Sequence, residues 1–289
     1  FLSSLRPDVI HICSLFEGYV DDAVSSIGKL DQKTMVSVTL YDLIPLLRTD
    51  QYLKPNPSYE QYYTRKVNFI KQASQLLAIS EFSREEGINN LGVDGAVVVN
   101  VSTSIDCHFR PLNIKQENLD ALRKKFNITR PYVFYTGGAD ERKNLSRLVQ
   151  AYAALPARLL QGHQLLFAGN MPKGCVAELE RVAKQAGLEK GDLCFTGYVS
   201  DEELAQLYNL CELYVFPSWH EGFGIPALEA MACGASVIGA NSSSLPEVIG
   251  LDEALFDPFD VEAITNNMQH TLTYVYDRKR LQELDQQRG

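Results

Sequence analysis

The feature that most constrains the fold is a regular alternation of short apolar runs and helical patterns in the second half of the chain. Short apolar runs bounded by turn residues are typical of buried strands. Apolar residues at helical spacing, such as Leu145, Leu148 and Tyr152, indicate amphipathic helices. Strands that alternate with helices form a parallel sheet covered by helices on both faces. The pattern therefore predicts a doubly wound α/β domain with strands over residues 132–136, 164–168, 193–195, 213–216, 236–240 and 254–256.

Local start and stop signals define the helices of this domain. Ser200 with Glu203 forms a capping box, and Pro226 suits a first helical turn because its missing N–H costs nothing there. Gly234 can end the helix that Pro226 begins. The expected helices span residues 145–155, 176–186, 201–210, 227–233, 245–249 and 261–274.

In the first half of the chain, strand and helix patterns also alternate, but less regularly. Ser83 with Glu86 three residues later predicts a capping box at the start of one helix. A second helix is expected over residues 62–73. The apolar runs predict a second parallel sheet, with strands over residues 8–12, 34–40, 76–79 and 96–101.

The domain boundary is expected where the pattern changes character, over residues 107–130. Pro111 and the charged run 123–125 indicate a connection with one exposed helix. A length of 289 residues also suits two domains. We therefore predict a partial N-terminal domain over residues 1–111 and a second domain over residues 112–289.

Composition excludes several classes of protein. A net charge of −9 and a pI near 5.1 argue against nucleic acid as a partner. The chain has no run of 18 apolar residues, so no membrane-spanning segment is expected. The six cysteines form no CxxC pair and are predicted to be buried free thiols of a reducing cytoplasm. The scattered histidines predict no metal site.

Ligands of open α/β sheets bind outside the carboxyl ends of the strands. Three predicted strand ends carry unusual residues. One strand leads through Gly137 and Gly138 to Arg142 and Lys143, a second leads to residues 196–199, and a third leads to a glycine loop between Glu221 and Glu229. These strand ends are the candidate binding site.

The basic pair, Arg142 and Lys143, precedes a predicted helix, whose N-terminus offers free N–H groups and a favourable dipole to an anion. Arginine adds a fork that grips two phosphate oxygens, and lysine adds a point charge. The adjacent glycines allow a ligand to approach the backbone closely. The alternative interpretation is two solvated cations on the surface.

The carboxylate loop can bind hydroxyl-rich ligands. Glu221 and Glu229 can accept hydrogen bonds from sugar or ribose hydroxyls, and the segment 222–224 can present N–H groups. The alternatives are a surface glutamate with a helix-stabilising glutamate, and a glycosidase pair of acid and nucleophile. An NAD site is disfavoured because no GxGxxG follows a strand.

These residues resemble a known family. The run from Glu221 to Glu229 resembles the E-x7-E motif of the retaining glycosyltransferases of family four, and the segment 138–144 (GADERKN) is similar to that family's phosphate loop. Other segments are also similar to that family. In the second half they are the strand ends YTG, FAG and FTG and the segment SLPEV with a later DP. In the first half they are PDVIH, DLIP and ISE. The resemblance implies the GT-B fold, in which two Rossmann-like domains face each other across a cleft.

The resemblance also implies roles for individual residues. Arg142 and Lys143 would hold the donor diphosphate and stabilise the departing charge, and Glu221 would bind donor-sugar hydroxyls. Glu229 would bind the ribose, and Tyr198 and Val199 would lie near the base. The other donor-binding residues that it implies are Gly137, Gly138, Gly222, Phe223, Gly224 and Ile225.

On the acceptor side, the resemblance implies a role for Tyr41 and Asp42. The family often has histidine where this chain has Tyr41, so a backbone carbonyl is expected to act there instead. The family's N-terminal glycine-rich loop and C-terminal crossing helix are both missing, so the chain is expected to be part of a larger protein.

The amino-acid sequences of these motifs resemble those of bacterial mannosyltransferases that build surface polysaccharide such as O-antigen. The resemblance implies transfer of mannose from GDP-mannose, or of another sugar from a UDP-sugar, to a glycan or lipid-linked acceptor. It implies retention of configuration, no metal and no cofactor. The reaction is expected in the cytoplasm or at the inner face of its membrane, with peripheral membrane association through neighbouring segments. The alternatives are a nucleotide-sugar epimerase and a non-catalytic binding module of a larger polymerase.

Overall fold

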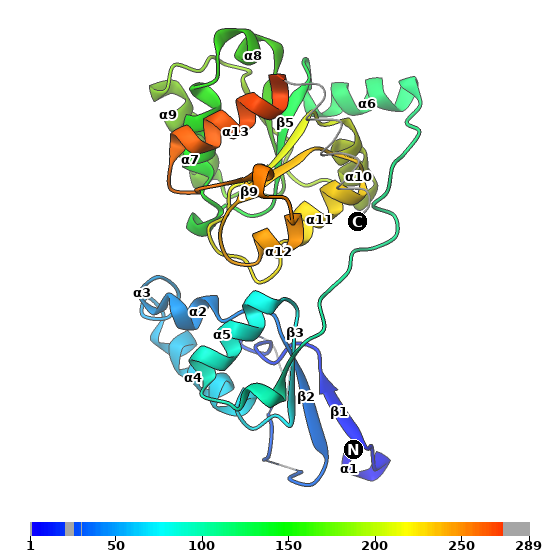
Figure 1. Cartoon of the computed structure of the whole chain (residues 1–289), viewed down its shortest axis with the longest axis vertical. Coiled ribbons are helices and arrows are strands. Elements are labelled where there is room, and N and C mark those ends of the chain that lie inside the picture. The colour runs from blue at the N-terminus through cyan, green and yellow to red at the C-terminus, as the bar shows by residue number, and fades with distance from the viewer. Residues whose placement is uncertain (1, 21–25, 30, 274–289) are drawn as a thin grey trace. The chain divides into compact units, whose positions relative to one another are not determined.

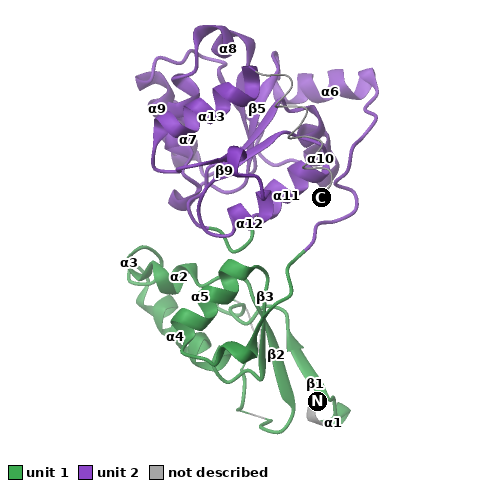
Figure 2. Cartoon of the chain, viewed as in Figure 1, with its two compact units in different colours: residues 1–103, 221–223 green, residues 104–220, 224–289 purple. Residues whose placement is uncertain are grey.

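The computed structural model describes residues 2–20, 26–29 and 31–273. The chain divides into two compact units, shown in Figure 2: unit 1 comprises residues 1–103 and 221–223, and unit 2 comprises residues 104–220 and 224–289. The division falls between residues 103 and 104, a few residues before the boundary that the sequence predicts. It also assigns three residues of the carboxylate loop to unit 1.

Unit 2 is built on a six-stranded parallel sheet with the strand order β10-β9-β8-β5-β6-β7. All six predicted strands are confirmed, with small shifts at their ends. Their bounds are β5 Tyr132–Thr136, β6 Gln164–Ala168, β7 Leu193–Phe195, β8 Leu213–Phe216, β9 Val237–Ala240 and β10 Leu255–Phe256.

Helices cover both faces of this sheet. As Figure 1 shows, α7, α9 and α13 pack together on one side, and α10, α11 and α12 on the other. The bounds are α6 Gln116–Phe126, α7 Leu145–Ala153, α8 Ala157–Gly162, α9 Lys173–Gln185, α10 Asp201–Leu210, α11 Ile225–Ala232, α12 Leu245–Ile249 and α13 Val261–Thr273, with short 3₁₀ turns η2 Glu141–Lys143 and η3 Asp252–Ala254. The sequence did not predict α8, and position 274 of the last predicted helix lies outside the described residues.

The core of unit 2 explains why this sheet forms. Every residue of β5, β6, β8 and β9 is buried, as expected for a parallel sheet covered on both faces. Phe134, Tyr208 and Tyr214 form a cluster of edge-to-face rings with centroids 5.4–5.8 Å apart. Such contacts add about 0.5–1.5 kcal/mol each beyond area burial. The cluster fixes α10, which carries Tyr208, against the sheet.

Unit 1 contains a four-stranded parallel sheet in the order β1-β2-β3-β4. Its strands are β1 Val9–Ile12, β2 Met35–Leu40, β3 Gln75–Ala78 and β4 Val98–Asn100. Its helices are α1 Leu2–Leu5, α2 Ile44–Leu47, α3 Thr49–Tyr52, α4 Pro57–Ile70 and α5 Glu81–Leu91, and η1 Gly95–Val97 is a 3₁₀ turn. Side chains of α4 and α5 share a core with the inward residues of the sheet.

Burial in unit 1 corrects one expectation. Along β2, Val36 and Val38 are buried whereas Met35 is 56% exposed, and Val9 on β1 is also exposed. Among the described residues, therefore, the sheet of unit 1 packs on one face, and the prediction of two covered faces is wrong there.

Two local predictions in unit 1 are also wrong, because a nearer residue supplies the cap. The helix assigned to a Ser83 cap begins at Glu81, since Ser80 leaves β3 in an extended conformation and accepts a hydrogen bond from the Ser83 N–H at 2.8 Å. The helix predicted over residues 62–73 begins at Pro57, since Asn56 caps it by accepting from the Tyr59 N–H at 3.1 Å.

A third correction concerns β4. The strand predicted over residues 96–101 is shortened by the 3₁₀ turn η1, which Asp94 caps by accepting from the Ala96 N–H at 2.9 Å. The exposed helix predicted in the connection between the domains is confirmed as α6.

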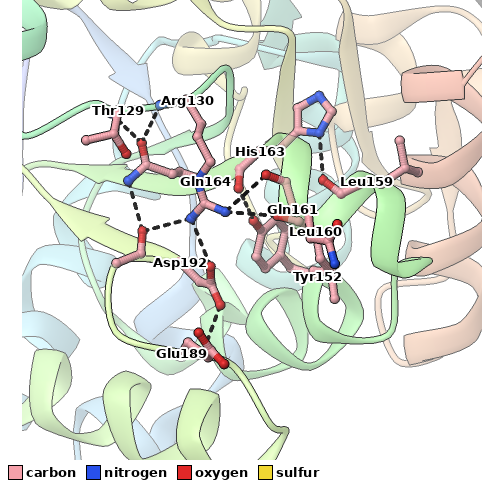
Figure 3. A network of polar contacts seen from close by, with 11 residues as sticks. Thr129, Arg130, Tyr152, Leu159, Leu160, Gln161, His163, Gln164, Glu189 and Asp192 are labelled. Atoms are coloured by element: carbon pink, nitrogen blue, oxygen red, sulfur yellow. Dashed lines mark hydrogen bonds and ion pairs between the residues drawn. The ribbon is translucent and has the colours of Figure 1, made fainter.

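A polar network holds the amino ends of β5 and β6 in unit 2 (Figure 3). Arg130 donates hydrogen bonds to the carbonyls of Leu160 and Gly191 and forms an ion pair with Asp192 at 2.8 Å. The Gln164 side chain accepts from the N–H groups of Thr129 and Arg130 and donates to Gly191 O. The network satisfies loop backbone groups at the end of the sheet opposite the candidate site.

The cysteines are free, as predicted, but not all are buried. Cys194, Cys211 and Cys233 are buried, whereas Cys13 and Cys107 are exposed, so the prediction of burial is wrong for those two. In the described part of the chain, no helix combines the length and the apolar character that a membrane span requires.

Candidate functional site

The strand order of unit 2 creates a topological switch point between β5 and β8. From β5 the chain proceeds to β6 and β7 on one side, and from β8 it proceeds to β9 and β10 on the other. Loops that leave neighbouring strands in opposite directions open a crevice at their carboxyl ends, where open α/β sheets bind ligands. The predicted basic pair follows β5, and the carboxylate loop follows β8.

The loop after β5 is shaped by close backbone packing. Gly137 has φ +138°, and a Cβ there would lie 2.9 Å from the Tyr135 hydroxyl oxygen. That hydroxyl donates to the Gly138 carbonyl at 2.8 Å. The conformation therefore requires glycine at position 137, and the loop turns directly into η2.

Arg142 joins this loop to the one that follows β8. Its Nη1 donates to the His220 carbonyl at 2.9 Å, and its own carbonyl accepts from the Trp219 N–H at 3.0 Å. Asp140 accepts from the Arg142 N–H at 3.1 Å, and its carboxylate lies 3.6 Å from Arg142 Nε. The ammonium of Lys143 lies 5.4 Å from the ring centroid of Phe216, the last residue of β8. Both cations thus lie at the switch point.

Asn144 is a positioning residue to which the sequence interpretation gave no role of its own. It has φ +62° and caps α7 from the left-handed region, which asparagine tolerates better than most residues. Its buried amide donates to the carbonyls of Pro217 and Pro258 at 3.1 and 2.6 Å. One side chain thereby connects the segments that follow β5, β8 and β10.

Glu229 lies on α11, which follows the β8 loop. Its carboxylate accepts a hydrogen bond from the Tyr208 hydroxyl at 2.9 Å. Burial raises the pKa of the Glu229 carboxyl to about 7, although the Tyr208 hydrogen bond and the nearby His108 lower it. Burial also holds the pKa of Tyr208 well above its usual range, so that this hydroxyl remains a donor. The carboxylate is therefore a partly desolvated acceptor.

The middle of the β8 loop belongs to unit 1. Glu221, Gly222 and Phe223 are buried there, and the Gly222 carbonyl accepts from the hydroxyls of Ser80 and Ser83 at 2.6 and 2.9 Å. The acceptor-side candidates lie in the same unit: Tyr41 is half exposed, and Asp42 accepts from the Ile44 N–H at 3.1 Å.

The remaining donor-side candidates lie in unit 2. Gly224 has φ +110° and precedes α11, of which Ile225 is the first residue. The candidates for the base, Tyr198 and Val199, follow β7, and the Tyr198 side chain is 79% exposed. The structure therefore brings the loops after β5 and β8 into direct contact and places Tyr198 two strands away from β5.

Among the described residues, no group of three or more His, Cys, Asp or Glu is arranged to hold a metal ion. A cavity of about 390 Å³ lies beside η2, between α7 and α9, and its lining includes Asp140, Glu141 and Arg147. Arg142 and Lys143 do not line this cavity, but Asp140 and Asn144 do, so it adjoins the loop that carries the basic pair.

Comparison with protein families gives one match. The family model described as glycosyl transferases group 1 matches residues 119–287, which is more than half of the chain.

Curated relatives are similar over most of this chain. A serotype-specific mannosyltransferase WbdA of Escherichia coli is 35% identical over 272 residues, which cover 94% of this chain and 33% of that protein. O-antigen chain mannosyltransferase B of Escherichia coli is 34% identical over 203 residues, covering 70% of this chain and 52% of that protein. The chain thus spans between a third and a half of the length of these relatives.

Solved structures are similar in fold. HepE of Anabaena, in complex with UDP and glucose, aligns with 99% of this chain and 75% of its own at a TM-score of 0.76 and 19% identity. Sucrose-phosphate synthase of Thermosynechococcus elongatus aligns with 99% of this chain and 69% of its own at a TM-score of 0.77 and 23% identity. At these identities the likeness concerns the fold, and it confirms the predicted α/β class with two parallel-sheet domains of the GT-B type.

Proposed function

Because the chain belongs to the glycosyl transferases of group 1, we propose that it acts as a retaining glycosyltransferase with a nucleotide-diphosphate sugar as its donor. The observation that carries the proposal is the hydrogen-bonded junction between Arg142 and the β8 loop at the switch point. This junction gathers positive charge where a diphosphate would lie, with Glu229 on the helix that follows.

In this proposal each group has a chemical task. Arg142 and Lys143 stabilise the negative charge that develops on the leaving diphosphate, which is electrostatic catalysis. Glu229 accepts a hydrogen bond from the ribose, and Glu221 accepts from hydroxyls of the donor sugar. Because the two cations can balance the diphosphate charge, we propose that no metal is needed.

The backbone and the base-side residues complete the donor site in this proposal. Gly137, Gly138, Gly222, Phe223, Gly224 and Ile225 surround the phosphates and the sugar. Tyr198 and Val199 contact the base, which suits the exposure of the Tyr198 ring.

The relatives support a choice of sugar and acceptor. Two relatives that are similar over long stretches are named mannosyltransferases, one of them for an O-antigen chain. We therefore propose transfer of mannose from GDP-mannose to a glycan or lipid-linked acceptor, with Tyr41 and Asp42 on the acceptor side. UDP is the nucleotide bound by HepE, so a UDP-sugar is the alternative donor. These substrates imply a reaction in the cytoplasm or at the inner face of its membrane.

Nucleotide binding is the first test. We expect GDP to raise the melting temperature of the chain more than UDP or ADP does, since a ligand at about 100 times its Kd stabilises by roughly 2.7 kcal/mol. Arg142→Ala should reduce that shift, and the exposed Arg181→Ala serves as the control. If none of the three nucleotides changes the melting temperature, the donor-site proposal is wrong.

Transfer is the second test, made with GDP-mannose and a mannose-terminated oligosaccharide, with and without EDTA. We expect an α-linked product from the α-linked donor, detected by NMR, at the same rate with EDTA. A β-linked product would refute retention, and loss of activity with EDTA would refute metal independence. A new free nucleotide sugar in the absence of acceptor would indicate an epimerase instead.

A further inference from the structure

Two exposed tyrosines follow neighbouring strands of the unit 1 sheet. β1 and β2 are parallel, with Ile12 opposite Val38, so the segments that follow them leave the sheet at the same edge. Tyr41 is the first residue after β2 and is 48% exposed, and Tyr19, in the segment after β1, is 39% exposed. Open α/β sheets bind ligands at this edge, outside the carboxyl ends of the strands.

The segment after β1 is fixed by contacts with α4. The Tyr62 hydroxyl donates to the carbonyl of Phe16, at 3.3 Å, and to that of Glu17. The Phe16 ring stacks on the ring of Tyr63, with centroids 4.5 Å apart. The backbone that leads to Tyr19 is therefore tied to a buried face of the helix.

The Tyr19 ring itself is oriented by two rings and one hydrogen bond. It meets Tyr59 edge to face, with centroids 5.1 Å apart, and it is tilted against Tyr62 at 5.3 Å. Its hydroxyl donates to Asn56 Oδ1 at 3.3 Å, and the same oxygen accepts from the Tyr59 N–H at 3.1 Å. The side chain is thus held in one place while it stays accessible to solvent.

An oriented, accessible aromatic ring beside polar groups suits a sugar. The C–H groups of a pyranose form an apolar face that packs on an aromatic ring, whereas its hydroxyls need hydrogen-bond partners. Asn56, bonded to the Tyr19 hydroxyl, and Glu17, in the same segment as Tyr19, are both exposed. They supply amide N–H donors and a carboxylate acceptor. Rings that serve only the core are buried, as those of Tyr62 and Tyr63 are.

We propose that Tyr19 is an acceptor-binding residue on which a sugar ring of a glycan acceptor stacks, with Asn56 and Glu17 bonding to the hydroxyls of that sugar. The inference rests on the proposed function, because it names a binding group for the acceptor of that reaction. Tyr19 extends the acceptor side, which the proposed function assigns to Tyr41 and Asp42, to the segment after the neighbouring strand.

Two substitutions at Tyr19 separate stacking from packing. Tyr19→Leu keeps an apolar side chain but removes the flat ring, and it should raise the KM for a mannose-terminated oligosaccharide about tenfold. Tyr19→Phe keeps the ring and loses only the bond to Asn56, so its KM should stay within about threefold of wild type. The kcat and the KM for GDP-mannose should be unchanged in both variants. Met35→Ala, which shortens an exposed apolar side chain at the opposite end of β2, is the control.

NMR of the bound oligosaccharide detects the contact directly. Without a donor, the oligosaccharide is added to the full chain, and protons of the stacked sugar should shift upfield because they lie over the face of an aromatic ring. The shift should persist in Tyr19→Phe and disappear in Tyr19→Leu.

Three outcomes would overturn the inference. Tyr19→Leu could keep the wild-type KM for the acceptor, or Tyr19→Phe could weaken the acceptor as much as Tyr19→Leu does, so that the ring is not the cause. Tyr19→Leu could also raise the KM for acceptor and donor by one common factor, which would mean that it disturbs the fold.

In each of these cases, mannose transfer by the wild type, together with weaker GDP binding by Arg142→Ala, would leave the proposed function intact. If the wild-type chain binds neither GDP nor the oligosaccharide and transfers no mannose, both the proposed function and this inference fail.

Discussion

At the scale of single residues, the candidate site places Glu229 in an environment that does not suit its charge. Burial raises the pKa of its carboxyl to about 7, while Tyr208 supplies one hydrogen bond. A carboxylate that is incompletely solvated in the free protein gains more from a new donor than a solvated one does. This property suits a group that must receive a ligand hydroxyl.

Glu229→Gln should make the stability of unit 2 less dependent on pH. The folded state keeps a proton on Glu229 up to about pH 7, whereas the unfolded state loses it near 4.5, the ordinary pKa of a glutamate carboxyl. The wild type therefore loses stability as the pH rises from about 4.5 to about 7. The variant should be more stable by roughly 1–3 kcal/mol at pH 8 and unchanged near pH 4.5.

Thermal unfolding at the two pH values measures this effect, with the exposed Glu180→Gln as the control. The same substitution should weaken GDP binding at pH 8 by at least about tenfold. An equal change in stability at both pH values would mean that the charge of Glu229 is not the cause.

Arg142 should not be replaceable by lysine. Its guanidinium already spans the His220 carbonyl and the Asp140 carboxylate, and a single ammonium cannot reproduce a planar fork. We expect Arg142→Lys to lower kcat/KM by about 10²-fold or more, and Arg142→Ala by a similar factor. A Lys variant with wild-type kinetics would show that only the charge at this position matters.

At the scale of elements, the site depends on how loops from three strands are joined. Asn144 connects the segments after β5, β8 and β10 through its backbone conformation and its amide. A change at this residue therefore affects the position of Arg142 without removing any group that the proposal assigns to the donor.

Asn144→Ala should destabilise the protein by about 2–4 kcal/mol, because it leaves two buried carbonyls without a donor and places alanine at positive φ. Asn144→Gly loses the same amide but tolerates the conformation, so it should cost about 1 kcal/mol less. Chemical denaturation of both variants measures the difference. Equal losses in the two variants would assign the whole effect to the side chain.

The network around Arg130 gives a comparison at the opposite end of the sheet. Arg130→Ala should cost about 2–3 kcal/mol, since it removes a partly buried ion pair and several bonds to backbone carbonyls. Arg181→Ala, which removes an exposed ion pair with Glu178, should lower the free energy of unfolding by at most about 0.5 kcal/mol. Nucleotide affinity should be unchanged in both variants. A loss of affinity in Arg130→Ala would mean that the two ends of the sheet are coupled.

The sequence predicted the elements of unit 2 well, because apolar periodicity there coincides with burial. Every strand from β5 to β10 was predicted, as was the capping box at Ser200, which the structure confirms. The prediction of helix starts failed where two nearby residues could both cap the helix. Both Ser80 and Ser83 can cap a helix, and only the extended backbone at the end of β3 selects Ser80.

The site was predictable only in part, for a related reason. Strand ends and charge indicated Arg142, Lys143 and Glu229 as candidates, and their roles stay predictions. Sequence spacing does not reveal which residues meet across the sheet, so the contacts of Asn144 and Tyr208 appear only once the loops and α10 are placed in unit 2.

At the scale of the whole molecule, the two units are predicted to respond differently to nucleotide. The proposed base and ribose contacts and the basic pair proposed for the diphosphate, Arg142 and Lys143, lie in unit 2. Hydrogen exchange with saturating GDP should therefore show protection over residues 138–145, 196–201 and 225–232. The helix α4, in unit 1, should exchange at the same rate with and without GDP. Protection that is strongest in α4 would contradict the assignment of nucleotide binding to unit 2.

The strand order of unit 2 also has a consequence for biosynthesis. β5 can pair with β6 soon after both emerge, but its other edge must wait for β8: Val133 pairs with Leu213, eighty residues later. At about 5–20 residues per second, a growing chain exposes that edge for roughly 4–16 s. The crevice between β5 and β8 therefore exists only in chains that have completed β8, and β9 and β10 join the sheet after it.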